Sequence, residues 1–285
     1  MLVNFGYTKV SRRMLFLLCS LVLLLAAAVP AARGAGPLIV GHRGASSDAP
    51  ENTLAAFRLA WEQGADGVEG DYRLSADGRV VCIHDADLKR VAGVPMVVKS
   101  ATFDELRAHD VGDWKGEAWR GERIASLEDV LAEVPKDKWL VVELKTGPEI
   151  VEPLAAAIEQ SSVPVEQILL IAFDAETIAA CKRRLPEVKC HWLAAYKQQE
   201  DGRWTPTPDE VVTTIRRIGA NGFGSESKPE VFDAEFVDRL RDGGVQEFHV
   251  WTVDDPQVAR FYRGLGAWGL TTNRPGKLRA ELSER

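Results

Sequence analysis

From Pro37 to its end, the chain alternates short β-branched, apolar runs with amphipathic helical stretches. Strand-like runs are Leu38–Gly41, Gly67–Leu74, Val80–His84, Trp139–Lys145, Ile168–Phe173, Lys189–Ala195, Asn221–Gly224, Glu247–Val253 and Trp268–Thr272. Helical patterns are Asn52–Gln63, Ser126–Val134, Glu149–Gln160, Ala175–Leu185, Asp209–Ile218, Ala234–Arg241 and Gln257–Leu265. This alternation predicts an α/β fold of the (β/α)8 TIM-barrel type. A doubly wound open sheet is disfavoured, because no G-x-G-x-x-G opens the first helix.

One of the strand-like runs is in excess of the eight that close such a barrel. Only five residues separate Leu74 from Val80, too few for the crossover helix that joins parallel strands. The dipeptide Asp77-Gly78 favours a hairpin there instead. A turn at this point places Glu69 opposite His84 and Asp71 opposite Cys82. We therefore expect a hairpin folded over the barrel mouth.

The first 35 residues differ from the rest. Lys9, Arg12 and Arg13 precede an uncharged apolar run of 16 residues, Met14–Val29, which small residues follow. These are the parts of a secretory signal peptide. The run is shorter than the ~20 residues that span a bilayer, so a cleaved signal is favoured over a retained anchor.

Residues 36–285 show no linker or break in composition, and we expect them to form one domain. The signal predicts an exported protein, periplasmic or secreted. If the signal is not cleaved, residues 14–29 attach the chain to a membrane.

The chain is acidic, with a net charge of −7 that becomes −11 without residues 1–35. The rest of the chain has no cluster of Lys or Arg, so nucleic-acid binding is not expected. Three cysteines remain, Cys82, Cys181 and Cys190. The last two are close enough in sequence to pair in an oxidising compartment, or they are small buried apolar residues; the sequence leaves both interpretations open.

Polar residues gather where the predicted strands end, which is the catalytic face of a TIM barrel. They are His42, Arg43, Glu69, Asp71, His84, Glu143 and Lys145. Strand alternation turns the two members of each E-x-D or E-x-K pair to the same side. An isolated pair of this kind is usually a solvated face, and a lone histidine is usually structural. The joint occurrence of these seven residues at successive strand ends favours a functional site.

The three carboxylates, Glu69, Asp71 and Glu143, cannot all stay charged in a dry cavity without a compensating cation. An all-oxygen ligand set suits Mg²⁺ or Ca²⁺ better than zinc. The sequence therefore predicts one divalent metal ion at this end of the barrel, without choosing between the two.

The motifs of the chain resemble those of glycerophosphodiester phosphodiesterases from Leu38 to about Leu278. The specific ones are Gly41–Ser46, Pro50–Thr53, Val68–Asp71, His84–Arg90 and Glu143–Lys145, and the looser ones are Trp251–Asp254 and Gly266–Pro275. The resemblance implies a TIM-barrel enzyme that hydrolyses a small-molecule glycerophosphodiester to glycerol 3-phosphate and an alcohol.

By matching motif, the resemblance also implies roles for individual residues. Glu69, Asp71 and Glu143 would bind the metal, and His42 and His84 would be the acid/base pair. Arg43 and Lys145 would hold the phosphate, and Trp251 would line the substrate pocket.

The chain departs from the family pattern at a few positions. Asn273 stands where the closing motif usually has Asp, and Asp254 stands where Asn is usual. These positions leave substrate preference open. The segment from Ala86 to Ala125, where the family carries an insertion, forms a lid or, as we favour, a surface loop in which Trp114 and Trp119 pack.

Two other functions keep the same fold. One is a lysophospholipase D type of phosphodiesterase, which apolar residues around the mouth would favour. The other is a non-catalytic protein that captures phosphodiesters, which has no need of His42 and His84 as proton-transfer residues. A glycosidase with paired carboxylates fits less well, since Arg43 and Lys145 suit an anion.

Overall fold

The computed structural model describes residues 1–2 and 36–283, and Gly36–Arg285 form one compact unit. The predicted signal peptide, with its apolar run at 14–29, lies outside the described residues. None of the helices that are described combines the length and the apolar character needed to cross a membrane.

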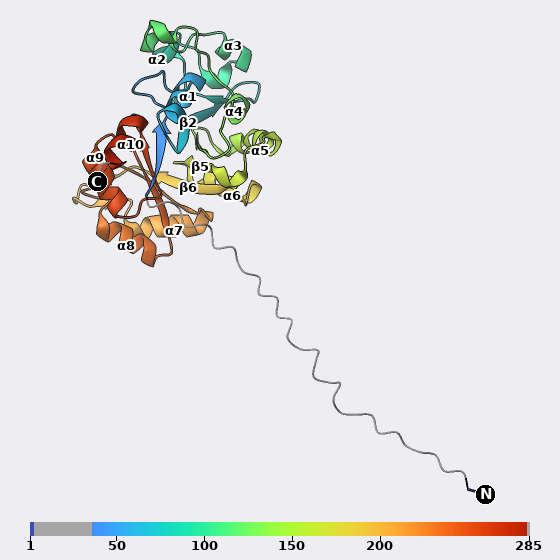
Figure 1. Cartoon of the computed structure of the whole chain (residues 1–285), viewed down its shortest axis with the longest axis vertical. Helices are drawn as coiled ribbons and strands as arrows, with labels where there is room; N and C mark the ends of the chain where they lie inside the picture. The colour runs from blue at the N-terminus through green and yellow to red at the C-terminus, as the bar shows by residue number, and fades with distance from the viewer. Residues whose placement is uncertain (3–35, 284–285) are drawn as a thin grey trace. The chain divides into compact units, whose positions relative to one another are not determined.

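Eight parallel strands close into a barrel, because β1 pairs with both β2 and β11. They are β1 (Leu38–His42), β2 (Gly67–Leu74), β4 (Trp139–Leu144), β5 (Ile168–Ala172), β6 (Lys189–Ala194), β9 (Gly222–Glu226), β10 (Glu247–Trp251) and β11 (Gly269–Thr272). The order around the barrel follows the chain, with helices between most successive strands (Figure 1). The predicted TIM barrel is confirmed.

Helices cover the outside of the barrel. They are α1 (Leu54–Glu62), α4 (Leu127–Leu131), α5 (Val151–Gln160), α6 (Ala175–Arg184), α7 (Pro208–Ile218), α8 (Ala234–Asp242), α9 (Pro256–Gly264) and α10 (Pro275–Ser283). Thr53, Asp174, Thr207 and Asp233 cap four of them by accepting hydrogen bonds from backbone N–H groups. The outward strand residues and the inner helix faces form two large apolar clusters. The apolar surface that stabilises the fold is buried between the strands and the helices. The carboxyl ends of the strands are not needed for it and can carry polar groups.

The predicted hairpin is present, but its register was wrong by one residue. The strand β3 (Val80–Cys82) runs antiparallel to the end of β2 and pairs Tyr72 with Cys82. Ile83, and not Cys82, therefore lies beside Asp71, and its N–H donates to the Asp71 carbonyl (2.8 Å). The connection between Ser75 and Arg79 has three residues and ends on Gly78 with a φ of +80°. Loop length sets the register of a hairpin, and β3 ends before His84.

The segment after the hairpin differs from the surface loop that the sequence analysis favoured. It contains α2 (Lys89–Ala92) and α3 (Phe103–Arg107), which lie at one end of the molecule in Figure 1. Its apolar residues form a core of their own with Val81 and Ile83 of the hairpin. Contrary to the expectation of two packed tryptophans, Trp114 is 43% exposed.

Two smaller features of the described residues bear on the sequence predictions. A short hairpin of β7 (Lys197–Gln198) and β8 (Trp204–Thr205) lies between β6 and α7, and the sequence analysis did not predict it. Cys82, Cys181 and Cys190 are buried free thiols. Of the two interpretations of Cys181 and Cys190, the structure has the small buried residues.

Candidate active site

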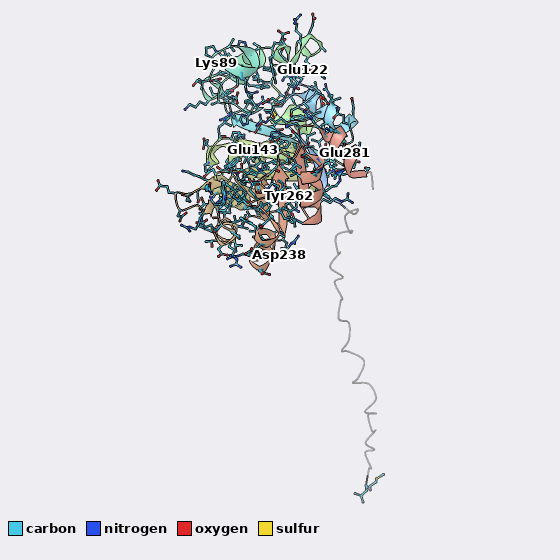
Figure 2. The ribbon with its side chains drawn as sticks, turned by 90° about the vertical axis from the view of Figure 1, so that its left-hand side faces the viewer. Lys89, Glu122, Glu143, Asp238, Tyr262 and Glu281 are labelled. Carbon is cyan, nitrogen blue, oxygen red and sulfur yellow. The ribbon has the colours of Figure 1, made fainter. Side chains whose placement is uncertain are left out.

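A cavity of about 240 Å³ opens at the carboxyl ends of the barrel strands. Seven of the eight predicted site residues line it: His42, Arg43, Glu69, His84, Glu143, Lys145 and Trp251. The eighth, Asp71, is fully buried behind them and contacts both Arg43 and Lys145. In Figure 2, Glu143 marks this region, between the insertion that carries Lys89 and the helical side that carries Tyr262. The fold thus brings all the predicted residues together.

Three carboxylates form the floor on the side of β2 and β4. Asp71 and Glu143 are register partners on these neighbouring strands, and Glu69 lies two residues earlier on the same face as Asp71. Their ligand oxygens all lie within 4.8 Å of one another. Oε1 of Glu69 is buried and has no hydrogen-bond partner among the described residues. Burial, with the charges of Asp71 and Glu143, raises the pKa of Glu69 well above its usual value.

Two cations border these carboxylates. Arg43 Nε lies 3.0 Å from Asp71 Oδ2, and Lys145 Nζ lies 3.0 Å from Asp71 Oδ1 and also contacts Glu143. Burial alone would raise the pKa of Asp71, but Arg43 and Lys145 outweigh it and lower the pKa. Three carboxylates against two cations leave one negative charge in excess. With the unpartnered oxygen of Glu69, this donor set fits a hard divalent cation.

The backbone around β1 and α1 orients this cluster. Arg43 and Asn52 have left-handed φ values of +55° and +60°. Residues other than glycine seldom adopt this backbone conformation. The turn at Arg43 aims its N–H at Glu69 Oε2 (2.9 Å). Asn52 holds Asp71 from two sides: Nδ2 donates to Asp71 Oδ2 (2.8 Å) and Oδ1 accepts from the Asp71 N–H (3.0 Å). Sequence reasoning gave Asn52 no role, although it lies in one of the quoted motifs.

The hydrogen bonds around His42 define which of its ring nitrogens carries the proton. Asn273 Nδ2 donates to Asp254 Oδ2 (2.6 Å), because a carboxylate only accepts. Asn273 Oδ1 is then the acceptor toward His42 Nδ1 (2.7 Å), so Nδ1 carries the proton and Nε2 is unprotonated in the neutral ring. Burial, with the charge of Arg43, lowers the pKa of His42. The sequence showed Asn273 and Asp254 as departures from a pattern but not their contact with His42.

His84 has a different partner. Its Nδ1 lies 2.7 Å from Asp85 Oδ1, and Arg90 Nε donates to the other oxygen of Asp85 (2.7 Å). Partial burial would raise the pKa of Asp85, but the bonds from Arg90 and His84 lower it to about 2. An ionised carboxylate therefore accepts from His84 Nδ1.

An aromatic wall faces the polar groups. The Trp251 ring meets Phe173 edge to face, with centroids 5.5 Å apart. Ile171 of β5 lies two residues before Phe173, which follows that strand, and His249 and Thr271 line the cavity from β10 and β11. Sequence reasoning found Trp251 but not these four. The signal that could have found them is strand alternation, which turns each to the inside of the barrel.

Comparison with known proteins identifies the family. The family model described as the glycerophosphoryl diester phosphodiesterase family matches residues 42–277. A glycerophosphodiester phosphodiesterase of Caldanaerobacter subterraneus subsp. tengcongensis is 31% identical over 246 residues, which cover 85% of this chain and 96% of the relative.

Solved structures agree in fold. A glycerophosphodiester phosphodiesterase of Thermotoga maritima is 26% identical with a TM-score of 0.68, over 86% of this chain and 97% of the other. A phosphodiesterase of Oleispira antarctica, solved in complex with the product sn-glycerol-3-phosphate, has a TM-score of 0.75 at 23% identity, over 87% and 98% of the two chains. The chain belongs to the glycerophosphoryl diester phosphodiesterase family and is an enzyme of that class, a hydrolase of glycerophosphodiesters.

Proposed function

We propose that this enzyme releases glycerol 3-phosphate and an alcohol with the help of one divalent metal ion and a pair of histidines. The observation that carries the proposal is the cavity itself. It joins a buried carboxylate cluster with an unpartnered oxygen to two imidazoles that have different partners. The relative from Oleispira antarctica, solved with sn-glycerol-3-phosphate, supports this product.

Glu69, Asp71 and Glu143 would hold the ion, either Mg²⁺ or Ca²⁺. When bound, the ion supplies Lewis acidity that neutralises charge on the non-bridging phosphate oxygens. Arg43 and Lys145, which line the cavity, add two fixed positive charges for the same anion. Both are already positioned by Asp71, so little rearrangement is needed when the phosphodiester binds.

His42 is the general base in this proposal. Its Nδ1 proton is committed to Asn273, so Nε2 offers a lone pair to the cavity. Its lowered pKa keeps the ring neutral near neutral pH. His42 Nε2 takes the proton of the attacking hydroxyl group, whether this belongs to water or to the glycerol moiety.

His84 is the general acid. The ionised Asp85 carboxylate accepts from Nδ1 and holds the ring, which leaves Nε2 as the nitrogen that would pass a proton to the leaving alkoxide. Arg90 holds Asp85 in place from the other side. The two histidines thus have opposite tasks because one faces an amide and the other a carboxylate.

Moving the negative charge of Asp254 next to His42 is expected to change the pH profile. In the double variant Asp254→Asn with Asn273→Asp, a carboxylate accepts from Nδ1, which stabilises the imidazolium and raises the pKa of His42. We expect the acidic limb of the kcat/KM profile to move up by about one pH unit or more. The single variant Asp254→Asn is the control. An acidic limb that stays in place in the double variant would contradict the base assignment.

Metal dependence is tested with the full-length chain. After removal of metal by a chelator, release of glycerol 3-phosphate from glycerophosphocholine is expected to stop and to return with Mg²⁺ or Ca²⁺. The ion that restores release identifies the cofactor. Undiminished release from metal-free protein would overturn the metal assignment. Release from lysophosphatidylcholine in place of glycerophosphocholine would overturn the substrate.

We also propose that residues 1–35 direct the enzyme out of the cytoplasm. The support is the charged start, the apolar run and the small residues that follow it. Cell fractionation and N-terminal sequencing of the isolated protein test this. An unprocessed chain in the cytoplasm would refute it, and an unprocessed chain in the membrane would show a retained anchor.

A further inference from the structure

A chain of alternating acidic and basic side chains connects the carboxylate cluster with His84. Its members, each in contact with the next, are Asp71, Arg43, Glu51, Arg90, Asp85 and His84. Each guanidinium group of this chain lies between two carboxylates. The proposed mechanism uses both ends of the chain, but it gives Glu51 no task and Arg90 only its bond to Asp85.

The loop between β1 and α1 fixes Glu51. The N–H of Asn52, the next residue, donates to the Arg43 carbonyl (3.1 Å), and the side chain of Asn52 is bonded to Asp71. This closed loop places the Glu51 carboxylate, whose side chain is 12% exposed, where its Oε1 accepts from Arg43 Nη1 (2.9 Å). A carboxylate so little exposed needs donors for both of its oxygens, and Arg43 reaches only one of them.

Arg90 supplies the remaining donors. Its Nη1 donates to Glu51 Oε2 (2.9 Å) and its Nη2 donates to Glu51 Oε1 (2.7 Å). Its Nε donates to Asp85 Oδ2 (2.7 Å), and the other oxygen of Asp85 lies 2.7 Å from His84 Nδ1. A two-point bond between a guanidinium group and a carboxylate fixes orientation as well as distance. Arg90 thus holds Glu51 and Asp85 in one geometry.

The insertion provides the anchor for Arg90. Leu88 and Val91, which lie close to Arg90 in sequence, are buried in the apolar core that the insertion shares with Val81 and Ile83 of the hairpin. Ile83 directly precedes His84, so the same core holds the start of α2 and the backbone next to the proposed acid. The position of Arg90 relative to His84 is therefore set by packing, and its position relative to the barrel is set by Glu51.

We propose that Glu51 and Arg90 are positioning residues that fix the general acid His84 relative to the phosphate-binding Arg43. His84 follows the hairpin and Arg43 follows β1, so the approach of the acid to the leaving oxygen of a phosphodiester held by Arg43 depends on a link between them. The insertion thereby gains a task in catalysis, because it carries Arg90. This inference rests on the proposed function, since it names what aligns the proposed acid with the bound phosphate.

The test compares two substrates that differ in their need for an acid. The full-length chain, loaded with the ion that restores activity, is assayed with glycerophosphocholine and with the 4-nitrophenyl ester of glycerol 3-phosphate, whose leaving group departs without a proton. We expect Arg90→Gln to lower kcat for glycerophosphocholine at least about tenfold and to leave hydrolysis of the nitrophenyl ester nearly unchanged, since Arg43 keeps its contacts with Glu51 and Asp71. A residue that only supports the fold would lower both rates alike.

Glu51→Gln should differ from Arg90→Gln in a defined way. Because Glu51 holds Arg43 as well as Arg90, its replacement is expected to lower the rates for both substrates. In the double variant, the loss for glycerophosphocholine should be smaller than the product of the two single losses, because both residues act through the same link. Single losses that multiply would contradict a shared task.

Arg107→Gln is the matched control. Arg107 is also an arginine of the insertion, its side chain is 46% exposed against 43% for Arg90, and it pairs with a carboxylate outside the insertion, Asp129 (3.0 Å). Neither Arg107 nor Asp129 lines the cavity. We expect this variant to hydrolyse both substrates like the wild type. If Arg90→Gln loses no more than Arg107→Gln, the inference is overturned.

His84→Ala, assayed alongside, separates the inference from the proposed function. If the wild type hydrolyses neither substrate, or if His84→Ala loses equally on both, the proposed function fails and the inference falls with it. If His84→Ala recovers on the nitrophenyl ester and Arg90→Gln does not, the inference alone is overturned. If Arg90→Gln does not fold, Arg90→Lys decides by the same comparison, because an ammonium group keeps the charge but cannot make the two-point bond to Glu51.

Discussion

Replacing Glu69 by glutamine is expected to reduce hydrolysis at least about 100-fold and, at the same time, to make the metal-free protein more stable at neutral pH. Activity falls because the amide offers the ion one neutral oxygen in place of a carboxylate. Stability rises because Glu69 is 2% exposed, next to Asp71 and Glu143, and its ionisation in the absence of a cation is unfavourable. A residue that only supports the fold would lower both quantities.

The sign of this stability effect depends on pH. Because folding raises the pKa of Glu69, its stabilising contribution is complete below the usual value of 4.5 and is lost as the pH rises toward the raised value. Within that window the free energy of unfolding of metal-free wild type falls by about 1.4 kcal/mol per pH unit for this group. Glu69→Gln should remove this part of the slope. Urea unfolding of both proteins with and without Mg²⁺ or Ca²⁺ measures it.

Glu51 provides a control of opposite sign. Burial would raise its pKa, but Arg90 and Arg43 outweigh it and lower the pKa. Its contribution to stability is therefore present above the usual value and is lost as the pH falls. Glu51→Gln should lower the stability at neutral pH, where Glu69→Gln raises it. If the free energy of unfolding depends on pH with the same slope in metal-free wild type and in Glu69→Gln, Glu69 is not a buried, destabilised carboxylate.

Replacing either His42 or His84, the proposed acid/base pair, by alanine is expected to reduce kcat for glycerophosphocholine by ~10²–10⁴-fold. The two losses should differ once the leaving group is changed. A 4-nitrophenyl ester of glycerol phosphate has a leaving group that needs no protonation, so His84→Ala should recover most of its rate on this substrate. His42→Ala should not, because the attacking hydroxyl group still needs a base.

The comparison of the two substrates also checks the geometry behind the assignment. His42 faces the amide of Asn273, and His84 faces the carboxylate of Asp85. If His42→Ala is the variant that recovers on the nitrophenyl ester, the roles are reversed. If both recover alike, neither histidine has a separate task. Retained affinity for glycerol 3-phosphate in both variants shows that the cavity is intact.

The barrel could be predicted because its signal is repeated in every strand and helix. The hairpin register could not, since Asp77-Gly78 is compatible with loops of two or three residues and a change of one residue turns every side chain to the other face. The fold of the insertion was also beyond prediction. Val98, Leu106 and Ile124 come together only in three dimensions, and none of the short segments that carry them shows a long periodic pattern.

The charged part of the site could be predicted because Glu69, Asp71, Glu143, Arg43 and Lys145 lie at strand ends, where alternation and topology decide position. The proton positions on the histidines could not. They depend on Asn273 and Asp254, which are far from His42 in sequence and carry no signal of their own.

The hydrogen bond between His42 and Asn273 joins the first strand of the barrel to the residue that follows the last one. A chain is synthesised from its N-terminus, so His42 emerges 231 residues before Asn273. Until β11 closes the barrel, nothing fixes the proton on Nδ1 of His42. In the proposed mechanism, His42 is therefore oriented as a base only after the last strand of the barrel has joined the first, so the acid/base pair is completed later than the set of metal ligands on β2 and β4.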